Sequence, residues 1–247
     1  VEDSIRFYSS VLPNLYKFVL RQSQEFATEA LNEHQRTLRM RGRPKIVLAR
    51  SYEEAMGLYK KYSNNTLGII SDARFPHEGV DDPLAGVKLL TEIRRYDPFV
   101  PLILQSAEEE NRSYANELDV QFIDKNSKKM DVDLREAVSA SFGFGDFIFL
   151  NPQTMEEVVR VHNLKELQNV IYSIPADSLL YHITRNHVSR WLYSRAIFPV
   201  AEFLKQVTWE SLQDIDAHRK IIFEAIVKYR KMKNQGVVAV FQRDRFD

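Results

Sequence analysis

Three short apolar segments, each ending on a polar residue, constrain the fold of this chain more than any other feature. The polar residues are, in chain order, Asp72, Ser106 and Lys125. Two of these segments contain runs of apolar residues without polar alternation, at 67–70 and 102–104, and a further run of this kind lies at 46–49. Such runs are typical of parallel strands buried on both faces of a sheet. The carboxyl ends of such strands meet at one edge, where α/β proteins bind their ligands. We therefore expect the three polar residues to lie at one site.

Strand patterns and helix patterns alternate strictly along the first part of the chain. The expected strands are 45–49, 66–71, 100–105 and 120–124, and the expected helices after them are 52–62, 85–96, 108–118 and 132–142. A long helix from Ser4 to Met40 comes first, and Pro13 should kink or split it. This order predicts an α/β fold, a doubly wound parallel sheet with an extended first helix.

Length and charge narrow the classes of protein. With 247 residues, the chain suits one α/β domain, 1–143, and a smaller domain, 144–247. Lys plus Arg and Asp plus Glu number 34 each, so no net field attracts the protein to nucleic acid or to a membrane surface. The chain has no cysteine, which excludes disulfides and thiolate metal sites and fits a reducing cytoplasm. A cytoplasmic protein without a nucleic-acid or membrane partner is expected.

The chemistry of the predicted site is that of phosphoryl transfer to a carboxylate. Glu2 and Asp3 add two carboxylates to that of Asp72, and a hard divalent cation such as Mg²⁺ relieves the repulsion among three such groups. Lys125 can neutralise a phosphoryl oxygen, and the Ser106 hydroxyl can donate a hydrogen bond to another. These residues therefore predict an aspartate that is phosphorylated with the help of Mg²⁺.

Over residues 1–143 the chain resembles the receiver domain of response regulators. The matching residues are the acidic pair Glu2 and Asp3, the phosphoacceptor Asp72, Pro76, Gly86, Ser106 with Ala107, Phe122 and Lys125. The resemblance implies a flavodoxin-like sheet of strand order 2-1-3-4-5, with Asp72, Ser106 and Lys125 as catalytic residues. It also implies a switch formed by Ser106 and Phe122, and Mg²⁺ bound by Glu2, Asp3, Asp72 and the Arg74 backbone carbonyl.

The chain departs from the receiver pattern at several positions. Val1 lies where the family's first strand ends, so that strand is expected to be truncated. Asn126 stands where the family usually has proline, and Arg74 lies two residues after the acceptor. An insertion at 77–84 lengthens the acceptor loop. These departures affect loop geometry, access of the phosphodonor and lifetime of the phosphoryl group.

The second part of the chain reads as a mainly helical output or linker domain. Its expected elements are a small hairpin of 146–150 and 157–161, a helix capped by Asn163 and ending near Tyr172, helices from Pro175 with breaks near Asn186 and Pro199, a last helix from Thr208 or Ser211 to Lys231, and an apolar segment 237–241. This part has no helix-turn-helix pattern and no Gly-rich phosphate loop. His182 and His187 are five residues apart, which favours packing over a metal pair on one helix face.

Segments 142–149, 177–195 and 237–247 resemble the region that follows a receiver in large bacterial proteins with a downstream phosphoenolpyruvate synthase-like, PEP/pyruvate-binding module. The resemblance implies a regulatory fragment rather than an enzyme, apart from self-phosphorylation. The expected partners are a histidine kinase or a small phosphodonor, the downstream module of the parent chain, and a second copy in a homodimer. Two alternatives stay open, a DNA-binding response regulator and a receiver-like scaffold that works without phosphorylation. A phosphatase with an aspartate nucleophile would need a second acid where Arg74 stands.

Overall fold

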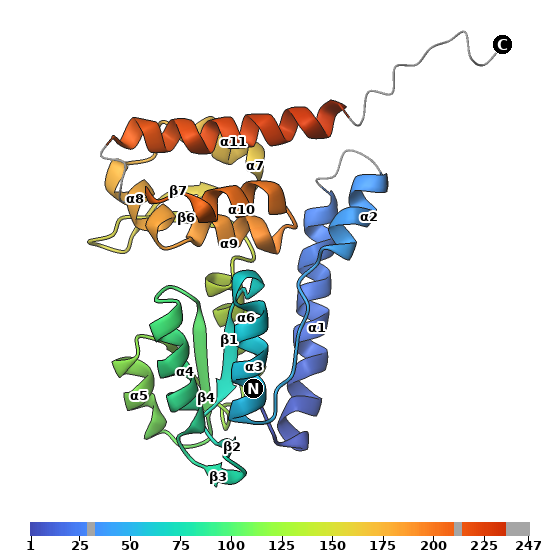
Figure 1. Ribbon diagram of the computed structural model, residues 1–247, viewed down its shortest axis with the longest axis vertical. Coiled ribbons are helices and arrows are strands. Elements are labelled where there is room, and N and C mark those ends of the chain that lie inside the picture. The colour runs from blue at the N-terminus through green and yellow to red at the C-terminus, as the bar shows by residue number, and fades with distance from the viewer. Residues whose placement is uncertain (29–32, 210–213, 236–247) are drawn as a thin grey trace, which may run out of the picture. The chain divides into compact units, whose positions relative to one another are not determined.

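The structure, a computed structural model, is drawn in Figure 1. It describes three stretches of the chain, residues 1–28, 33–209 and 214–235. Its contacts divide the chain into two compact units, the first containing Val1–Gln22 and Arg43–Phe144 and the second containing Ser23–Gly42 and the chain from Gly145 onward. The first unit therefore ends close to the expected domain boundary between residues 143 and 144. Residues 23–42, which were expected in the first domain, belong to the second unit.

The first unit is built on a parallel sheet of three strands. They are β1 (Ile69–Asp72), β4 (Leu102–Ser106) and β5 (Gln121–Asp124), in the order β1-β4-β5. The register pairs Asp72 with Gln105 and Ser106 with Asp124, so the carboxyl ends of the three strands lie level with one another. Every residue of β4 is buried, as the apolar run 102–104 predicted for a central strand.

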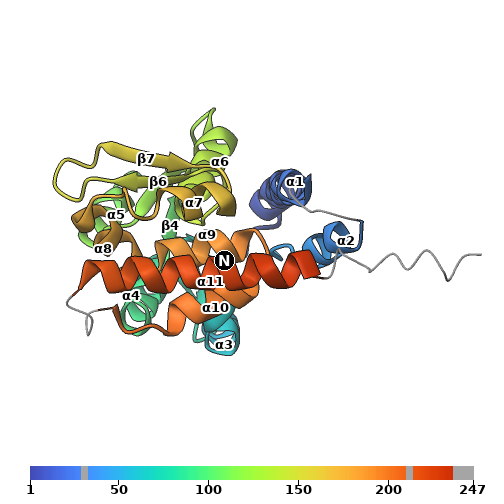
Figure 2. The same cartoon turned by 90° about the horizontal axis from the view of Figure 1, so that it is seen from above.

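Helices cover this sheet. They are the first part of α1 (Ile5–Thr28), α3 (Tyr52–Tyr62) with the short 3-10 turn η1 (Ser63–Asn65), α4 (Ala85–Tyr96), α5 (Asn111–Glu117) and α6 (Met130–Ser141). Figure 2 shows α6 on one side of the sheet and α3 and α4 on the other. The helices expected at 52–62 and 85–96 are confirmed with the same bounds, because each has a clear amphipathic pattern. The Ser51 side chain accepts a hydrogen bond from Glu54 N at 3.2 Å and caps α3.

One expectation about the first unit is wrong, and one of the two alternatives in another is excluded. The segment 45–49 is not a strand, because it meets the start of the chain through a single backbone bond from Glu2 N to Ala49 O (3.0 Å) rather than through a ladder. Pro13 does not split the first helix, since α1 runs through it. Val11 and Leu15 on either side of Pro13 are buried, and their packing offsets the lost backbone hydrogen bond. Residues 29–32, within the long helix expected to reach Met40, lie outside the described part, and α2 (Glu33–Arg41) follows them.

The expected insertion after the acceptor forms a small hairpin of β2 (Phe75–His77) and β3 (Val80–Asp82). Glu78 and Gly79 at its tip both have positive φ, 54° and 76°, as the type I′ turn of a two-residue hairpin requires. Phe75 is fully buried and anchors the hairpin in the first unit's core. The insertion is thus an ordered element rather than a structureless loop.

The second unit is mainly helical, with one hairpin. The hairpin pairs β6 (Phe147–Leu150) with β7 (Glu157–Val161), and the helices are α7 (Leu164–Val170), α8 (Ala176–Thr184), α9 (His187–Ser194), α10 (Phe198–Gln206) and α11 (Ile215–Gln235), together with α2 and the end of α1. The expected hairpin and the breaks near Asn186 and Pro199 are confirmed. Asn163 caps α7 as predicted, its side chain accepting from Glu166 N at 2.9 Å.

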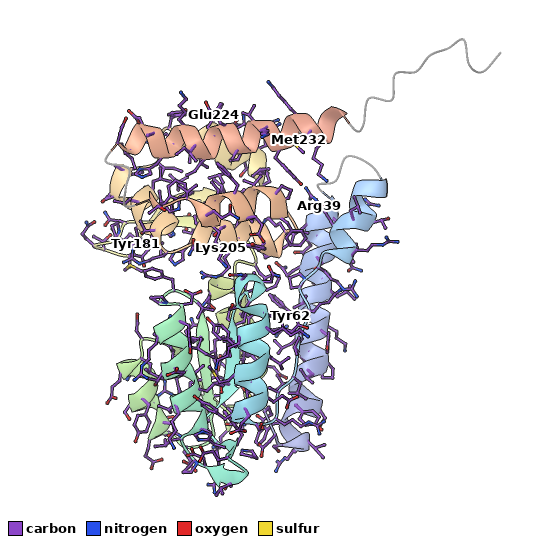
Figure 3. The ribbon with its side chains drawn as sticks, viewed as in Figure 1. Arg39, Tyr62, Tyr181, Lys205, Glu224 and Met232 are labelled. Atoms are coloured by element: carbon purple, nitrogen blue, oxygen red, sulfur yellow. The ribbon has the colours of Figure 1, made fainter. Side chains whose placement is uncertain are left out.

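The last helix of the second unit, α11, begins at Ile215, later than either predicted start; Ser211 and the segment 237–241 lie outside the described residues. Ile222 and Ile226 on α11 are fully buried in a core with Trp191. Its other face exposes charged and flexible side chains, among them Glu224 and Met232 (Figure 3). This division of faces is typical of a helix that packs on one side against a domain core.

Candidate functional site

The carboxyl end of the parallel sheet brings the three predicted polar residues to one edge. Asp72 is the last residue of β1, Ser106 is the last of β4, and Lys125 directly follows β5. All three are buried, with 8%, 4% and 8% of their surface exposed. Polar side chains this deeply buried need partners, and their partners define the site.

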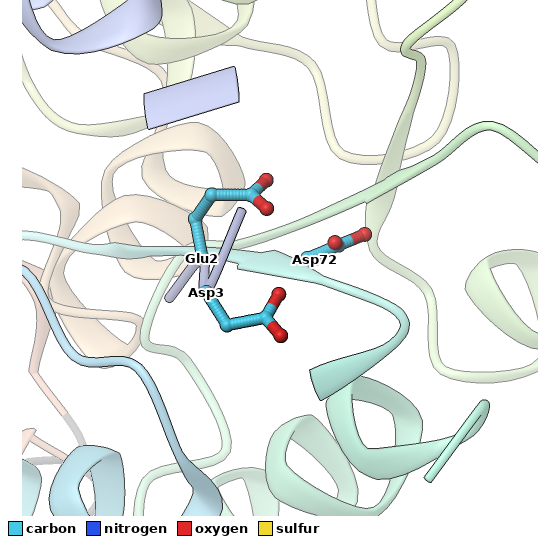
Figure 4. Close-up of side chains that lie close together, drawn as sticks. All are labelled: Glu2, Asp3 and Asp72. Atoms are coloured by element: carbon cyan, nitrogen blue, oxygen red, sulfur yellow. The ribbon is translucent and has the colours of Figure 1, made fainter. Parts of the chain in front are cut away.

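Glu2 and Asp3 join Asp72 because the start of the chain runs beside β1. The Val1 carbonyl accepts from Asp72 N at 2.9 Å, and Val1 N donates to the Ile70 carbonyl at 2.5 Å. Glu2, Asp3 and Asp72 each offer a carboxylate oxygen within 4.8 Å of those of the other two (Figure 4). Two oxygens on opposite sides of a Mg²⁺ ion lie about 4 Å apart, so the three carboxylates fit such an ion with small side-chain adjustments.

Lys125 bridges two of these carboxylates. Its Nζ lies 2.5 Å from Glu2 Oε2 and 2.6 Å from Asp72 Oδ2. The ammonium also lies over the Phe7 ring, 4.2 Å from the ring centroid, in a cation–π contact. The three donors of the ammonium thus have two carboxylates and one aromatic face available. Lys125 acts as counterion of the acidic cluster, and a divalent cation would take over part of that role.

Burial raises the pKa of the Glu2 carboxyl above its ordinary value, and the hydrogen bond from Lys125 opposes this rise. The other oxygen of the carboxylate, Oε1, accepts from Ser4 N at 3.1 Å at the start of α1. Glu2 is therefore fixed at both oxygens, one by a backbone amide and one by the ammonium.

Asp72 is positioned by the backbone that follows it. Ala73 N donates to Asp72 Oδ1 at 2.7 Å, and Gly86 N at the start of α4 donates to the Ala73 carbonyl at 2.9 Å. A Cβ on Gly86 would lie 1.9 Å from the Asp72 carbonyl oxygen. Only glycine lets α4 approach the Asp72 backbone this closely.

The Ser106 hydroxyl is held by the first residue of α5 and by the loop that precedes this helix. Its Oγ accepts from Glu108 N at 3.0 Å and from Asn111 Nδ2 at 2.9 Å. Phe122, the other predicted switch residue, is half-buried on β5, and the Arg112 guanidinium lies over its ring at 4.5 Å.

The Arg74 side chain points to the inserted hairpin. Its guanidinium donates to both Asp81 oxygens, from Nε at 2.9 and 3.2 Å and from Nη2 at 2.6 Å. Glu108 Oε1 lies 4.0 Å from Arg74 Nη1. This leaves the Arg74 backbone carbonyl as the predicted metal ligand, which stays a prediction.

Asn126, in place of the expected proline, ties two loops of the site together. Its Nδ2 donates to the Ala107 carbonyl at 2.8 Å, and its backbone N donates to Asp124 Oδ1 at 2.8 Å. The loop after β5 is thus connected to the loop after β4 by a side-chain amide.

Sequence reasoning missed Phe7, Asn111 and Asp81 at this site. Phe7 contacts Lys125 from a distant part of the chain, whereas Asn111 and Asp81 lie five and seven residues after their partners Ser106 and Arg74. The exact spacing to Ser106 at a helix start is the only sequence signal that could have indicated Asn111.

His182 and His187, in the second unit, do meet, although their spacing is wrong for one helix face. Their Nδ1 atoms are 3.0 Å apart, and His182 Nε2 accepts from Leu150 N at 2.9 Å. Since Nε2 accepts, neutral His182 carries its proton on Nδ1 and donates it to His187. Burial lowers the pKa of His182 to about 4 and that of His187 to about 3. The pair is a hydrogen-bonded packing element, in agreement with the expected packing role.

Comparisons with protein-family models, with curated proteins and with solved structures gave no significant match to this chain. None of the helices in the described part of the chain has the length and hydropathy needed to cross a lipid bilayer.

Proposed function

We propose that this chain is a receiver of the two-component type, in which a phosphoryl group is transferred to Asp72 and regulates an attached or partner module. One observation carries the proposal: three carboxylates and the Lys125 ammonium converge at the carboxyl edge of a parallel α/β sheet, with Lys125 Nζ 2.6 Å from Asp72. Carboxylates packed around a buried lysine are costly for stability, which favours a chemical reason for the cluster.

The backbone bonds of Val1 and Glu2 support a flavodoxin-like arrangement for this receiver. Val1 pairs with β1 on one side through Ile70 and Asp72, and Glu2 pairs with Ala49 on the other. A first strand between the segment 45–49 and β1 would supply the ladder that 45–49 lacks, and the order would then be 2-1-3-4-5. Ligands of such sheets bind at the switch in strand order, next to the first strand.

In the proposed reaction, an Asp72 carboxylate oxygen attacks the phosphorus of a phosphohistidine or of a small acyl phosphate. The new bond joins that oxygen to phosphorus, and the bond from phosphorus to the donor's nitrogen or oxygen breaks with its electron pair leaving on the donor. When bound, Mg²⁺ would supply positive charge beside the transferred group. Glu2, Asp3 and Asp72 would hold it with the Arg74 carbonyl.

Lys125 and Ser106 contribute the protein's own stabilisation of the transferred group. The Lys125 ammonium already contacts Asp72 and can pair with a phosphoryl oxygen as charge develops. Ser106 lies at the end of the neighbouring strand, and its hydroxyl can donate a hydrogen bond to a second phosphoryl oxygen. Phosphorylation then biases the arrangement of Ser106 and Phe122, which transmit the signal on the β4, α5 and β5 side.

The regulated module is proposed to be a PEP/pyruvate-binding enzyme module downstream in the parent chain, with a cytoplasmic histidine kinase or a small phosphodonor as source of phosphate. The helical second unit would connect the receiver to it. A homodimer is a further proposed partner.

Hydrogen exchange with and without beryllofluoride, a phosphoryl mimic, tests whether the site regulates anything. We expect exchange to change in β4, α5 and β5 of the wild type in the presence of Mg²⁺, and to change less in Ser106→Ala. If exchange at saturating mimic changes only in the acceptor loop, the chain is a passive scaffold and the proposal fails.

A further inference from the structure

We propose that Asn111 and Arg112, the first two residues of α5, hold the two switch residues in the resting arrangement, and that they are positioning residues for the response to phosphorylation. This inference rests on the proposed function of Asp72. Asn111 acts on Ser106, and Arg112 acts on Phe122.

The Asn111 side chain is built into the site. Only 4% of its surface is exposed, as for Ser106, and its Nδ2 lies 2.9 Å from Ser106 Oγ. Together with Glu108 N at 3.0 Å, it occupies both acceptor positions of the hydroxyl oxygen. The Ser106 side chain is therefore fastened by two accepted hydrogen bonds, one from the first residue of α5 and one from the loop that precedes this helix.

Movement of Ser106 toward a phosphoryl group must break the bond to Asn111. The amide would then be buried without its partner, which disfavours the moved state. Asn111 thus stabilises the resting state selectively, which is the property that a residue controlling a two-state equilibrium needs.

Arg112 acts on the second switch residue from the same turn of helix. Its guanidinium lies over Phe122 at 4.5 Å and is oriented by Glu109, whose Oε2 accepts from Arg112 Nη2 at 3.2 Å. An inward turn of the Phe122 ring would give up this cation–π contact. Because Asn111 and Arg112 are adjacent, a shift of the beginning of α5 releases both switch residues together.

The test is the affinity for beryllofluoride at fixed Mg²⁺ concentration, measured by ¹⁹F NMR of the bound ligand. Asn111→Ala removes one hydrogen bond that stabilises only the resting state. The equilibrium then shifts toward the state that binds beryllofluoride, and binding should tighten about fivefold. Arg112→Gln should tighten binding in the same direction. If either residue had only a structural role, its replacement would weaken binding. The sign of the change in affinity therefore separates a positioning role from a structural one.

Two matched variants serve as controls. Asn116→Ala removes an exposed asparagine of the same helix. Arg95→Gln breaks the Arg95–Glu92 pair on α4, which has the same three-residue spacing as Arg112–Glu109. Both should bind beryllofluoride as the wild type does.

Asn111→Ala changes a buried residue, whereas Arg112 is exposed and its variant should fold normally. Unchanged or weaker binding in Arg112→Gln, or in folded Asn111→Ala, would overturn the inference while leaving the proposed function intact. If the wild type binds no better than Asp72→Asn, the proposed function fails, and the inference falls with it.

Discussion

Replacement of Gly86 by alanine should displace Asp72 through the addition of a single methyl group. The new Cβ would lie 1.9 Å from the Asp72 carbonyl oxygen and 2.9 Å from Ala73 Cα, whereas real Cβ atoms essentially never come within 3.0 Å of such atoms. The start of α4 or the acceptor backbone must therefore move by about 1 Å, and overpacking of this kind costs about 1–3 kcal/mol.

Two further effects adjust this figure. The same movement strains the bond from Gly86 N to the Ala73 carbonyl, worth about 1 kcal/mol. The gain in helix propensity from Gly to Ala is about 1 kcal/mol in the opposite direction. We expect Gly86→Ala to lower the free energy of unfolding by about 2 kcal/mol, and to weaken the binding of beryllofluoride because Asp72 is displaced.

Gly57 provides a matched control, since it lies exposed on α3 and a Cβ there meets no atom within 4 Å. Gly57→Ala should raise stability by about 0.5–1 kcal/mol. Urea unfolding followed by circular dichroism measures both variants. If Gly86→Ala is as stable as the wild type and binds beryllofluoride normally, the close approach of α4 to the acceptor is refuted.

Three other predictions follow from the sites described. Mg²⁺ should raise the unfolding temperature of the wild type and much less that of Asp3→Asn, with Glu108→Gln as the control that keeps the wild-type response; an equal rise in all three would contradict the carboxylate site. Ser106→Ala should still accept phosphate on Asp72, as measured by intact mass. Its hydrogen exchange in β4, α5 and β5 should change less with beryllofluoride than that of the wild type. His182 and His187 should stay neutral in the folded protein at pH 5 by NMR, because their pKa values are lowered to about 4 and about 3 while the unfolded chain titrates near 6.5. Protonation of the unfolded chain then favours unfolding, so the free energy of unfolding should decrease as the pH is lowered from 6.5, by about 2 kcal/mol at pH 5 for His182 alone. Titration of either histidine near pH 6.5 in the folded protein would contradict this prediction.

The elements that could be predicted are those whose signals are local. The helices α3 and α4 follow from an amphipathic repeat, and Ser51 and Asn163 cap their helices through bonds to residues three positions on. The ends of the parallel strands could be placed because unbroken apolar runs end on polar residues, and this brought Asp72 and Lys125 to one edge.

The elements that could not be predicted depend on distant partners. The segment 45–49 has the composition of a strand, but strand formation needs a neighbouring ladder, and a single bond to Glu2 does not form one. Pro13 is tolerated because α1 is held by its buried face, which a local rule does not consider. The contacts of Asn111 with Ser106 and of Phe7 with Lys125 arise only when separate elements meet in the fold.

The central claim is that Asp72 accepts a phosphoryl group in a reaction that requires a divalent cation, and intact mass with peptide mapping after incubation with acetyl phosphate tests it most directly. We predict one phosphoryl group, mapped to Asp72, in the presence of Mg²⁺ and none when the cation is chelated, because uncompensated carboxylates repel the donor. Asp124→Asn, which changes the carboxylate at the end of β5, two strands away in the sheet, should be labelled like the wild type. An unmodified Asp72 under conditions that phosphorylate a known receiver, or equal labelling of Asp72→Asn, would contradict the account.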